Sequence, residues 1–248
     1  MSQPHDLIVG IIGGMGPEAT IDLMARIIEL TPATEDSDHI HMLVDNNPKV
    51  PSRIDAIVNR APIDPTPTLI AMAQGLERQG ADYLVMPCNT AHAYHEAIAA
   101  EISIPFLNLL ELTARAAVQK VPGLCKVGLL GSSALGLTKI YEPIFANLGV
   151  EVCYPDPAQQ QDIMHLIKTI KAKKTASDAG LILAKATNQL LAKDVGVIII
   201  ACTELSLVTD LLQQHLVTVD AADVLAREVV RRSTRGSASS ASEDLSIR

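Results

Sequence analysis

Aromatic residues are scarce in this chain of 248 residues: they make up 2% of it, and there is no tryptophan. Apolar residues nevertheless reach 48%. The core must therefore be built from Ile, Leu, Val, Ala and Met, which suits layers of helices on a β-sheet. The length fits two compact halves that share one interface.

Other absences exclude whole classes of partner. A formal net charge of −8 argues against nucleic acid, which needs a basic surface, but it leaves room for a small acidic substrate. No apolar run approaches the ~20 residues of a membrane helix, and residues 1–6 lack the basic start of a signal peptide. The four cysteines have no CxxC spacing, which argues against a zinc ribbon or a thioredoxin motif. We expect a cytoplasmic protein with free thiols, no metal, and neither nucleic acid nor membrane as a partner.

Two of the cysteines occupy matching places. Residues 83–86 form a short apolar run, typical of a buried strand, that is followed by Pro87, Cys88, Asn89 and Thr90. A second run, residues 195–201, ends in Cys202 and Thr203. In open α/β sheets, ligands bind beyond the carboxyl ends of the strands. A helix that starts after each cysteine would lower the pKa of its thiol, which favours a functional role over simple packing.

The two halves repeat one order of elements: a strand that ends in glycine, helices, a strand that ends in cysteine, a helix and a short strand. The repeat spans 118 residues from Gly13 to Gly131 and 114 residues between the two cysteines, which indicates an internal duplication. The fold class is α/β, with two pseudosymmetric, doubly wound, Rossmann-like lobes, a mainly parallel sheet in each, and the active site between them. We assign residues 1–112 and 220–233 to the first lobe and 113–219 to the second, and expect 234–248 to be a disordered tail.

Several elements are predicted with definite bounds. Residues 46–66 are expected to be a long loop, and Ser177 is expected to cap the helix that follows it. Helices are predicted over residues 91–101, 137–148, 177–193 and 221–232, and a short strand over 104–107.

Two motifs leave alternatives open. Gly14 to Ala19 satisfies the GxGxxA pattern after a strand, with Asp45 ending the next strand, which would also suit a nicotinamide cofactor. The pattern is weak alone, because a glycine turn before a helix serves any anion. Cys88, His92 and His95 have the spacing of a metal-binding helix face, but that alignment fails if the helix begins only near residue 91.

Four segments together resemble the aspartate/glutamate racemase family, and the aspartate racemases in particular. They are Ile11–Pro17 (IIGGMGP), Asn46–Arg53 (NNPKVPSR), Pro87–His92 (PCNTAH) and Ala201–Leu205 (ACTEL). The resemblance implies a cofactor-independent racemase, usually a homodimer, with Cys88 and Cys202 as the two acid/base thiols. It implies substrate contacts from Asn89, Thr90 and Thr203, and carboxylate binding by Arg53 and a lysine, which we take to be Lys171. We add Met15, Ser132 and Glu204 to the predicted substrate-binding set.

The chemistry of racemisation agrees with this duplicated arrangement. The α-hydrogen leaves one face of the carbon and a proton returns on the other, so two groups on opposite sides suffice. We expect racemisation of aspartate, L to D, by a two-base mechanism that uses two cysteines. The alternatives are a racemase of broader acidic amino-acid specificity that includes glutamate, a nicotinamide-dependent oxidoreductase, and a non-catalytic amino-acid-binding protein.

Overall fold

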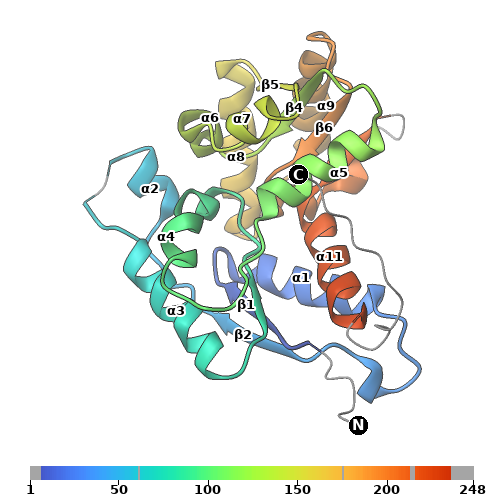
Figure 1. Ribbon diagram of the computed structural model, residues 1–248. Helices are drawn as coiled ribbons and strands as arrows, with labels where there is room; N and C mark the ends of the chain where they lie inside the picture. Colours follow the sequence, from blue (N-terminus) through green and yellow to red (C-terminus); the bar gives the residue numbers. More distant parts are fainter. Residues whose placement is uncertain (1–6, 61, 175, 213–215, 236–248) are drawn as a thin grey trace.

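The structure is a computed structural model, and it describes residues 7–60, 62–174, 176–212 and 216–235. Two parallel sheets, each between helices, make up the molecule (Figure 1). The elements up to the middle of the chain are β1 (Val9–Gly13), α1 (Pro17–Leu30), η1 (Asp36–Asp38), β2 (Met42–Asn46), α2 (Arg53–Ile57), α3 (Thr66–Arg78), β3 (Tyr83–Val85), η2 (Thr90–Tyr94), α4 (His95–Ala99) and α5 (Leu109–Lys120). The rest are β4 (Lys126–Leu130), α6 (Ser133–Thr138), α7 (Glu142–Ala146), β5 (Glu151–Cys153), α8 (Pro157–Lys171), α9 (Ala179–Leu191), β6 (Val197–Ile200), α10 (Thr203–Ser206), η3 (Thr209–Leu211), β7 (Thr218–Asp220) and α11 (Ala221–Arg235).

The two sheets have the same topology. The first has strand order β2-β1-β3 and the second has order β5-β4-β6-β7, with all pairs parallel. An isolated parallel bridge from Leu84 to Phe106 takes the place in the first sheet that β7 takes in the second. The predicted α/β fold with two duplicated, doubly wound lobes is therefore confirmed.

Helices cover both faces of each sheet. Leu23 and Ile27 of α1 pack with Leu225 of α11 against Val9 and Ile11 of β1. The other face is covered by apolar residues of α3 and α4. In the second sheet, α5 and α7 cover one face and α8 and α9 the other. Because aromatic residues are few, aliphatic side chains fill these layers, and the strands are buried on both faces as parallel strands usually are.

Several predicted bounds are wrong for identifiable reasons. Residues 104–107 form the single bridge at Phe106 rather than a strand. The predicted helix 137–148 is two helices, because Lys139 adopts a left-handed conformation with φ 53° and Pro143 lies in the first turn of α7. Residues 91–101 are split between the 3-10 helix η2 and α4.

Three further expectations need correction. The 46–66 loop contains the short helix α2, whose N-cap Ser52 accepts a hydrogen bond from the backbone N–H of Asp55. Asp178 rather than Ser177 is the N-cap of α9. Helix α11 continues to Arg235, so the predicted tail begins inside it, and the remainder, residues 236–248, lies outside the described residues. The lobe boundaries stay a prediction.

Candidate active site

One cavity gathers the chemistry-bearing residues of both sheets. Fourteen residues line it, and all ten of the predicted site residues are among them: Met15, Arg53, Cys88, Asn89, Thr90, Ser132, Lys171, Cys202, Thr203 and Glu204. Sequence reasoning missed four of the lining residues, which are Ser52, Ile54, Ile167 and Ala201.

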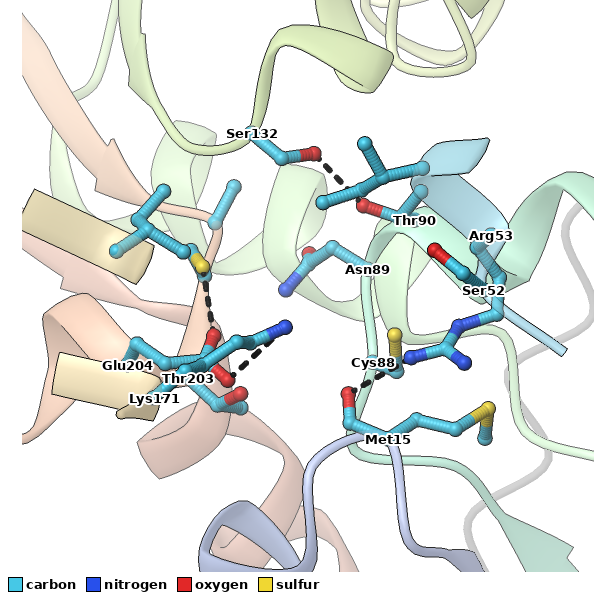
Figure 2. Close-up of a pocket in the computed structure, with 14 residues that line it drawn as sticks. Met15, Ser52, Arg53, Cys88, Asn89, Thr90, Ser132, Lys171, Thr203 and Glu204 are labelled. Atoms are coloured by element: carbon cyan, nitrogen blue, oxygen red, sulfur yellow. Dashed lines mark hydrogen bonds and ion pairs between the residues drawn. The ribbon is translucent and has the colours of Figure 1, made fainter. Parts of the chain in front are cut away.

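The parallel topology explains this convergence. Met15 follows β1, Cys88 follows β3, Ser132 follows β4 and Cys202 follows β6, so each comes just after the carboxyl end of its strand. Those ends of the two sheets face one another across the cavity, as ligand sites in doubly wound folds do. Figure 2 shows Cys88, Arg53 and Met15 on one side, and Lys171, Thr203 and Glu204 on the other.

Glu204 connects Cys202 to Lys171. The thiol of Cys202 donates a hydrogen bond to Oε2 of Glu204 at 3.0 Å, and the Nζ of Lys171 lies 3.3 Å from Oε1 of the same carboxylate. Burial and the negative charge of Glu204 raise the pKa of the Cys202 thiol well above its ordinary value. We expected a helix start to lower this pKa, and that expectation is wrong, because α10 spans four residues and the buried carboxylate outweighs it.

Lys171 is held in its charged form. Burial lowers its pKa, but the negative charge of Glu204, with smaller contributions from Cys202 and Cys88 in their ionised forms, raises it by more, so the pKa lies above the ordinary value. Lys171 is the last residue of α8, and Ile167, one turn earlier, lines the same cavity. Of the other lysines near this helix end, Lys173 pairs with Glu18 at 2.8 Å.

Arg53 carries the second positive charge of the cavity wall. Its guanidinium donates to the carbonyl oxygens of Pro51 at 3.0 Å and, at 3.5 Å, of Met15. Its Nε is buried and has no protein partner. The arginine is therefore anchored by backbone carbonyls and retains donor capacity for an anion.

Two polar side chains after β3 bond to the second sheet's unit. The hydroxyl oxygens of Thr90 and Ser132 lie 2.9 Å apart, and Oδ1 of Asn89 accepts a hydrogen bond of 2.6 Å from the hydroxyl of Tyr141. Nδ2 of Asn89 is buried without a partner. In Figure 2 this nitrogen faces the open middle of the cavity.

His92 supports the loop that carries Cys88. The backbone N–H of Leu109 donates to Nε2 of His92 at 3.1 Å, so Nε2 carries no hydrogen. Nδ1 must then hold the proton and donate it to the carbonyl oxygen of Cys88 at 2.9 Å. Burial lowers the pKa of His92 to about 4, which keeps the ring neutral. Both ring nitrogens are thus occupied, and no group of three or more possible metal ligands occurs in the described part of the chain.

The loop after β1 argues against the nicotinamide cofactor that the GxGxxA pattern would suit. Gly14 has φ 91°, and a Cβ at this position would lie 2.2 Å from the backbone of Asn47. The close approach that this glycine permits is therefore to the chain's own backbone.

No helix in the described ranges has the length and apolar character needed to cross a membrane.

Comparisons with known proteins show that this chain is similar to amino-acid racemases. A family model described as Asp/Glu/Hydantoin racemase matches residues 12–229. The broad specificity amino-acid racemase RacX of Bacillus subtilis is 30% identical over 231 residues, which cover 90% of this chain and 96% of that protein.

Solved structures share the fold. The aspartate racemase of Picrophilus torridus superposes with a TM-score of 0.76 at 27% identity, covering 92% of this chain and 94% of that one. A putative Asp/Glu racemase from Yersinia pestis gives a TM-score of 0.78 at 22% identity, covering 92% and 99%. The second likeness concerns the fold alone.

Proposed function

This chain belongs to the Asp/Glu/hydantoin racemase family, and from that premise we propose that it racemises aspartate with two cysteine thiols and no cofactor. The observation that carries the proposal is that Cys88 and Cys202, which follow equivalent strands of the two sheets, line one cavity together with Arg53 and Lys171. Two thiols on different walls of a cavity can act on opposite faces of one α-carbon.

The charged side chains of the cavity match the three charged groups of aspartate. Apart from the thiolate that the mechanism requires, Arg53, Lys171 and Glu204 are the charged groups among the fourteen lining residues. Aspartate at neutral pH has two carboxylates and one ammonium group, which sum to −1. Arg53 can bind one carboxylate bidentately, Lys171 can bind the other, and Glu204 is the one acceptor of suitable charge for the ammonium group.

The mechanism we propose starts from one thiolate and one thiol. Cys202 is the protonated partner in the substrate-free state, because its hydrogen is donated to Glu204 and its pKa is raised. Cys88, as thiolate, removes the α-proton of one enantiomer while Cys202 delivers its proton to the opposite face. The two thiols have then exchanged roles, and the reverse reaction uses them in the opposite sense.

The intermediate is a carbanion, so negative charge develops on the α-carboxylate. The unpartnered Nδ2 of Asn89 and Nε of Arg53 are donors that can receive this charge. Preorganised donors of this kind in a buried site are usually the largest source of rate enhancement. In this mechanism the protein itself, rather than a cofactor, stabilises the carbanion.

A broader substrate range is the second candidate. RacX, the relative at 30% identity, is named a broad specificity racemase. Ile54, Ile167 and Met15 give the cavity wall apolar surface, and Lys171 is already paired with Glu204, so an apolar side chain would leave that pair intact. Glutamate is a third option, because it has the same charges as aspartate and one more methylene group.

One assay separates these candidates. Purified protein is incubated with each L-amino acid in turn, and the D-enantiomer is measured by chiral chromatography. The proposal expects aspartate to react fastest, with glutamate slower and neutral amino acids slowest. Equal rates for neutral amino acids and aspartate would favour the broader range, and binding of aspartate with no conversion would favour a binding protein. The homodimer and the cytoplasmic location remain part of the proposal.

A further inference from the structure

Asn89 is the best-placed neutral donor of the cavity, and its orientation depends on a residue that does not line the cavity. Asn89 is 3% exposed, its Nδ2 has no protein partner, and Figure 2 shows this nitrogen facing the centre of the site. The other end of the amide, Oδ1, accepts the hydroxyl of Tyr141. An amide has one donor end and one acceptor end, so whatever bonds to one end decides which end faces the substrate.

The geometry of this bond identifies the donor. The Oη–Oδ1 separation of 2.6 Å lies in the range of an O–H···O hydrogen bond and below the usual range for N–H···O. Burial also raises the pKa of Tyr141, so its hydroxyl keeps its hydrogen. Tyr141 therefore donates, and the oxygen of the Asn89 amide faces away from the cavity.

Tyr141 is itself rigidly held. Its side chain is fully buried in the core on the face of the second sheet that α5 and α7 cover, where its ring packs against Phe145 with centroids 6.0 Å apart. It precedes α7, whereas Asn89 follows β3 of the first sheet. The bond thus joins residues that are 52 positions apart in the chain. Through it, a tyrosine in the core of the second sheet fixes the orientation of an amide that follows the first sheet.

We propose that Tyr141 is a positioning residue, whose hydroxyl holds the amide of Asn89 so that Nδ2 faces the substrate carboxylate. The inference rests on the proposed function in one respect, that the ligand is an amino acid. Without the hydroxyl, Oδ1 of Asn89 would be buried without a partner, and the amide would rotate to find one. A rotated amide presents its oxygen to the carboxylate, where it repels the substrate.

Tyr141→Phe tests the proposal, with Tyr154→Phe as the matched control. Both changes remove one phenolic oxygen from the second sheet's unit, but the hydroxyl of Tyr154 bonds to Glu142 and Leu135, and Tyr154 does not line the cavity. For Tyr141→Phe we expect KM for the best substrate to rise roughly 10- to 100-fold, the effect of one hydrogen bond to a charged group. We expect a smaller change in kcat, since both thiols remain. The control should leave KM unchanged.

A double-mutant cycle distinguishes positioning from a general structural effect. In an Asn89→Ala background, Tyr141→Phe should raise KM no further, because the amide through which it acts is gone. Equal effects in the two backgrounds would overturn the proposal. So would equal effects of Tyr141→Phe and Tyr154→Phe on KM in the wild-type background.

A measurement without substrate separates this inference from the proposed function. In ¹⁵N-labelled protein, the side-chain amide signals of Asn89 are assigned by their absence from Asn89→Asp. They should shift in Tyr141→Phe and stay in place in Tyr154→Phe, and signals that stay in place in both would overturn the inference. A wild-type protein that racemises no amino acid would instead contradict the proposed function. The change in the amide signals of Asn89 would still show whether Tyr141 bonds to this amide.

Discussion

The thiol of Cys202 donates its hydrogen bond to a carboxylate two residues later, Oε2 of Glu204, at 3.0 Å. The same carboxylate pairs with Lys171. A thiol in this position resists ionisation, because a thiolate would be buried next to a negative charge. The two cysteines of the cavity therefore differ in their surroundings although they follow equivalent strands, and this difference has consequences for the pH dependence of the reaction.

Glu204→Gln should move the alkaline limit of activity to lower pH. The mechanism needs one thiol to stay protonated, and activity is lost as the pH rises through the pKa of that thiol. Removing the negative charge of Glu204 lowers the pKa of Cys202, so the fall in kcat/KM should begin at lower pH than in the wild type. The two directions must give the same profile, since the equilibrium constant between enantiomers is one.

Glu18→Gln is the control for this change. This variant also loses a carboxylate that is paired with a lysine, in this case Lys173, but Glu18 does not line the cavity. Its kcat/KM profile should match the wild type. An alkaline limb that is unmoved in Glu204→Gln would show that Cys202 is not the group that must stay protonated.

Cys88→Ser and Cys202→Ser should each lower racemisation ~10²- to 10⁴-fold in both directions, the usual loss when a positioned acid or base is removed. Each variant should retain slow α-proton exchange of one enantiomer, because the surviving thiol still reaches its own face. The two variants should differ in which enantiomer exchanges. Chiral chromatography and proton NMR in D2O measure the two effects, and near-normal racemisation by either variant would eliminate the two-thiol mechanism. Cys125→Ser is a suitable control, as Cys125 is exposed and outside the cavity.

Arg53→Ala should abolish most activity on aspartate, and Arg53→Lys should restore little of it, because lysine cannot form the bidentate contact. We expect a rise in KM of at least ~10-fold for both variants. Arg78→Ala, an exposed arginine at the end of α3, serves as the control. If Arg53→Ala keeps the wild-type KM for aspartate, Arg53 is not a carboxylate ligand.

The stability of the fold should depend on His92 in mildly acidic solution. Its pKa is about 4 when folded and 6.5 as the reference value. The unfolded chain therefore binds the proton first, and stability falls as the pH drops from about 6.5 towards 4. The shift corresponds to about 3 kcal/mol in the free energy of unfolding. Urea unfolding at pH 7 and pH 5 should show a smaller loss for His92→Gln than for the wild type, and identical losses would contradict the assignment.

Sequence patterns predicted the residues that line the cavity better than the helices and loops around it. Strand-end cysteines and glycine turns are local signals, and parallel topology then brings them together, so all ten predicted residues reached the cavity. Tyr141 carried no such signal, because a buried tyrosine looks like ordinary core until its partner 52 residues away is known. The supporting role of His92 has no local signal either, because it depends on the backbone N–H of Leu109, which lies 17 residues further along the chain.

Some of the missed features did have a signal in the sequence. Ser52 followed by Asp55 is typical of a helix N-terminus, and it marks α2 within the 46–66 loop. Pro143 marks the start of α7. The raised pKa of Cys202 had none, since it depends on how deeply Glu204 is buried beside the thiol, and burial is a property of the packed structure.

Proton transfer at the α-carbon in D2O tests the central claim most directly. The L-amino acid that reacts fastest, which we expect to be aspartate, is incubated with the enzyme, and the α-proton of each enantiomer is followed by NMR after chiral separation. Two thiols on opposite faces predict that the first D-product carries deuterium, while the remaining L-substrate keeps its proton. Deuterium that enters the L-substrate as fast as the D-product forms, or D-product that retains the original proton, would contradict the account.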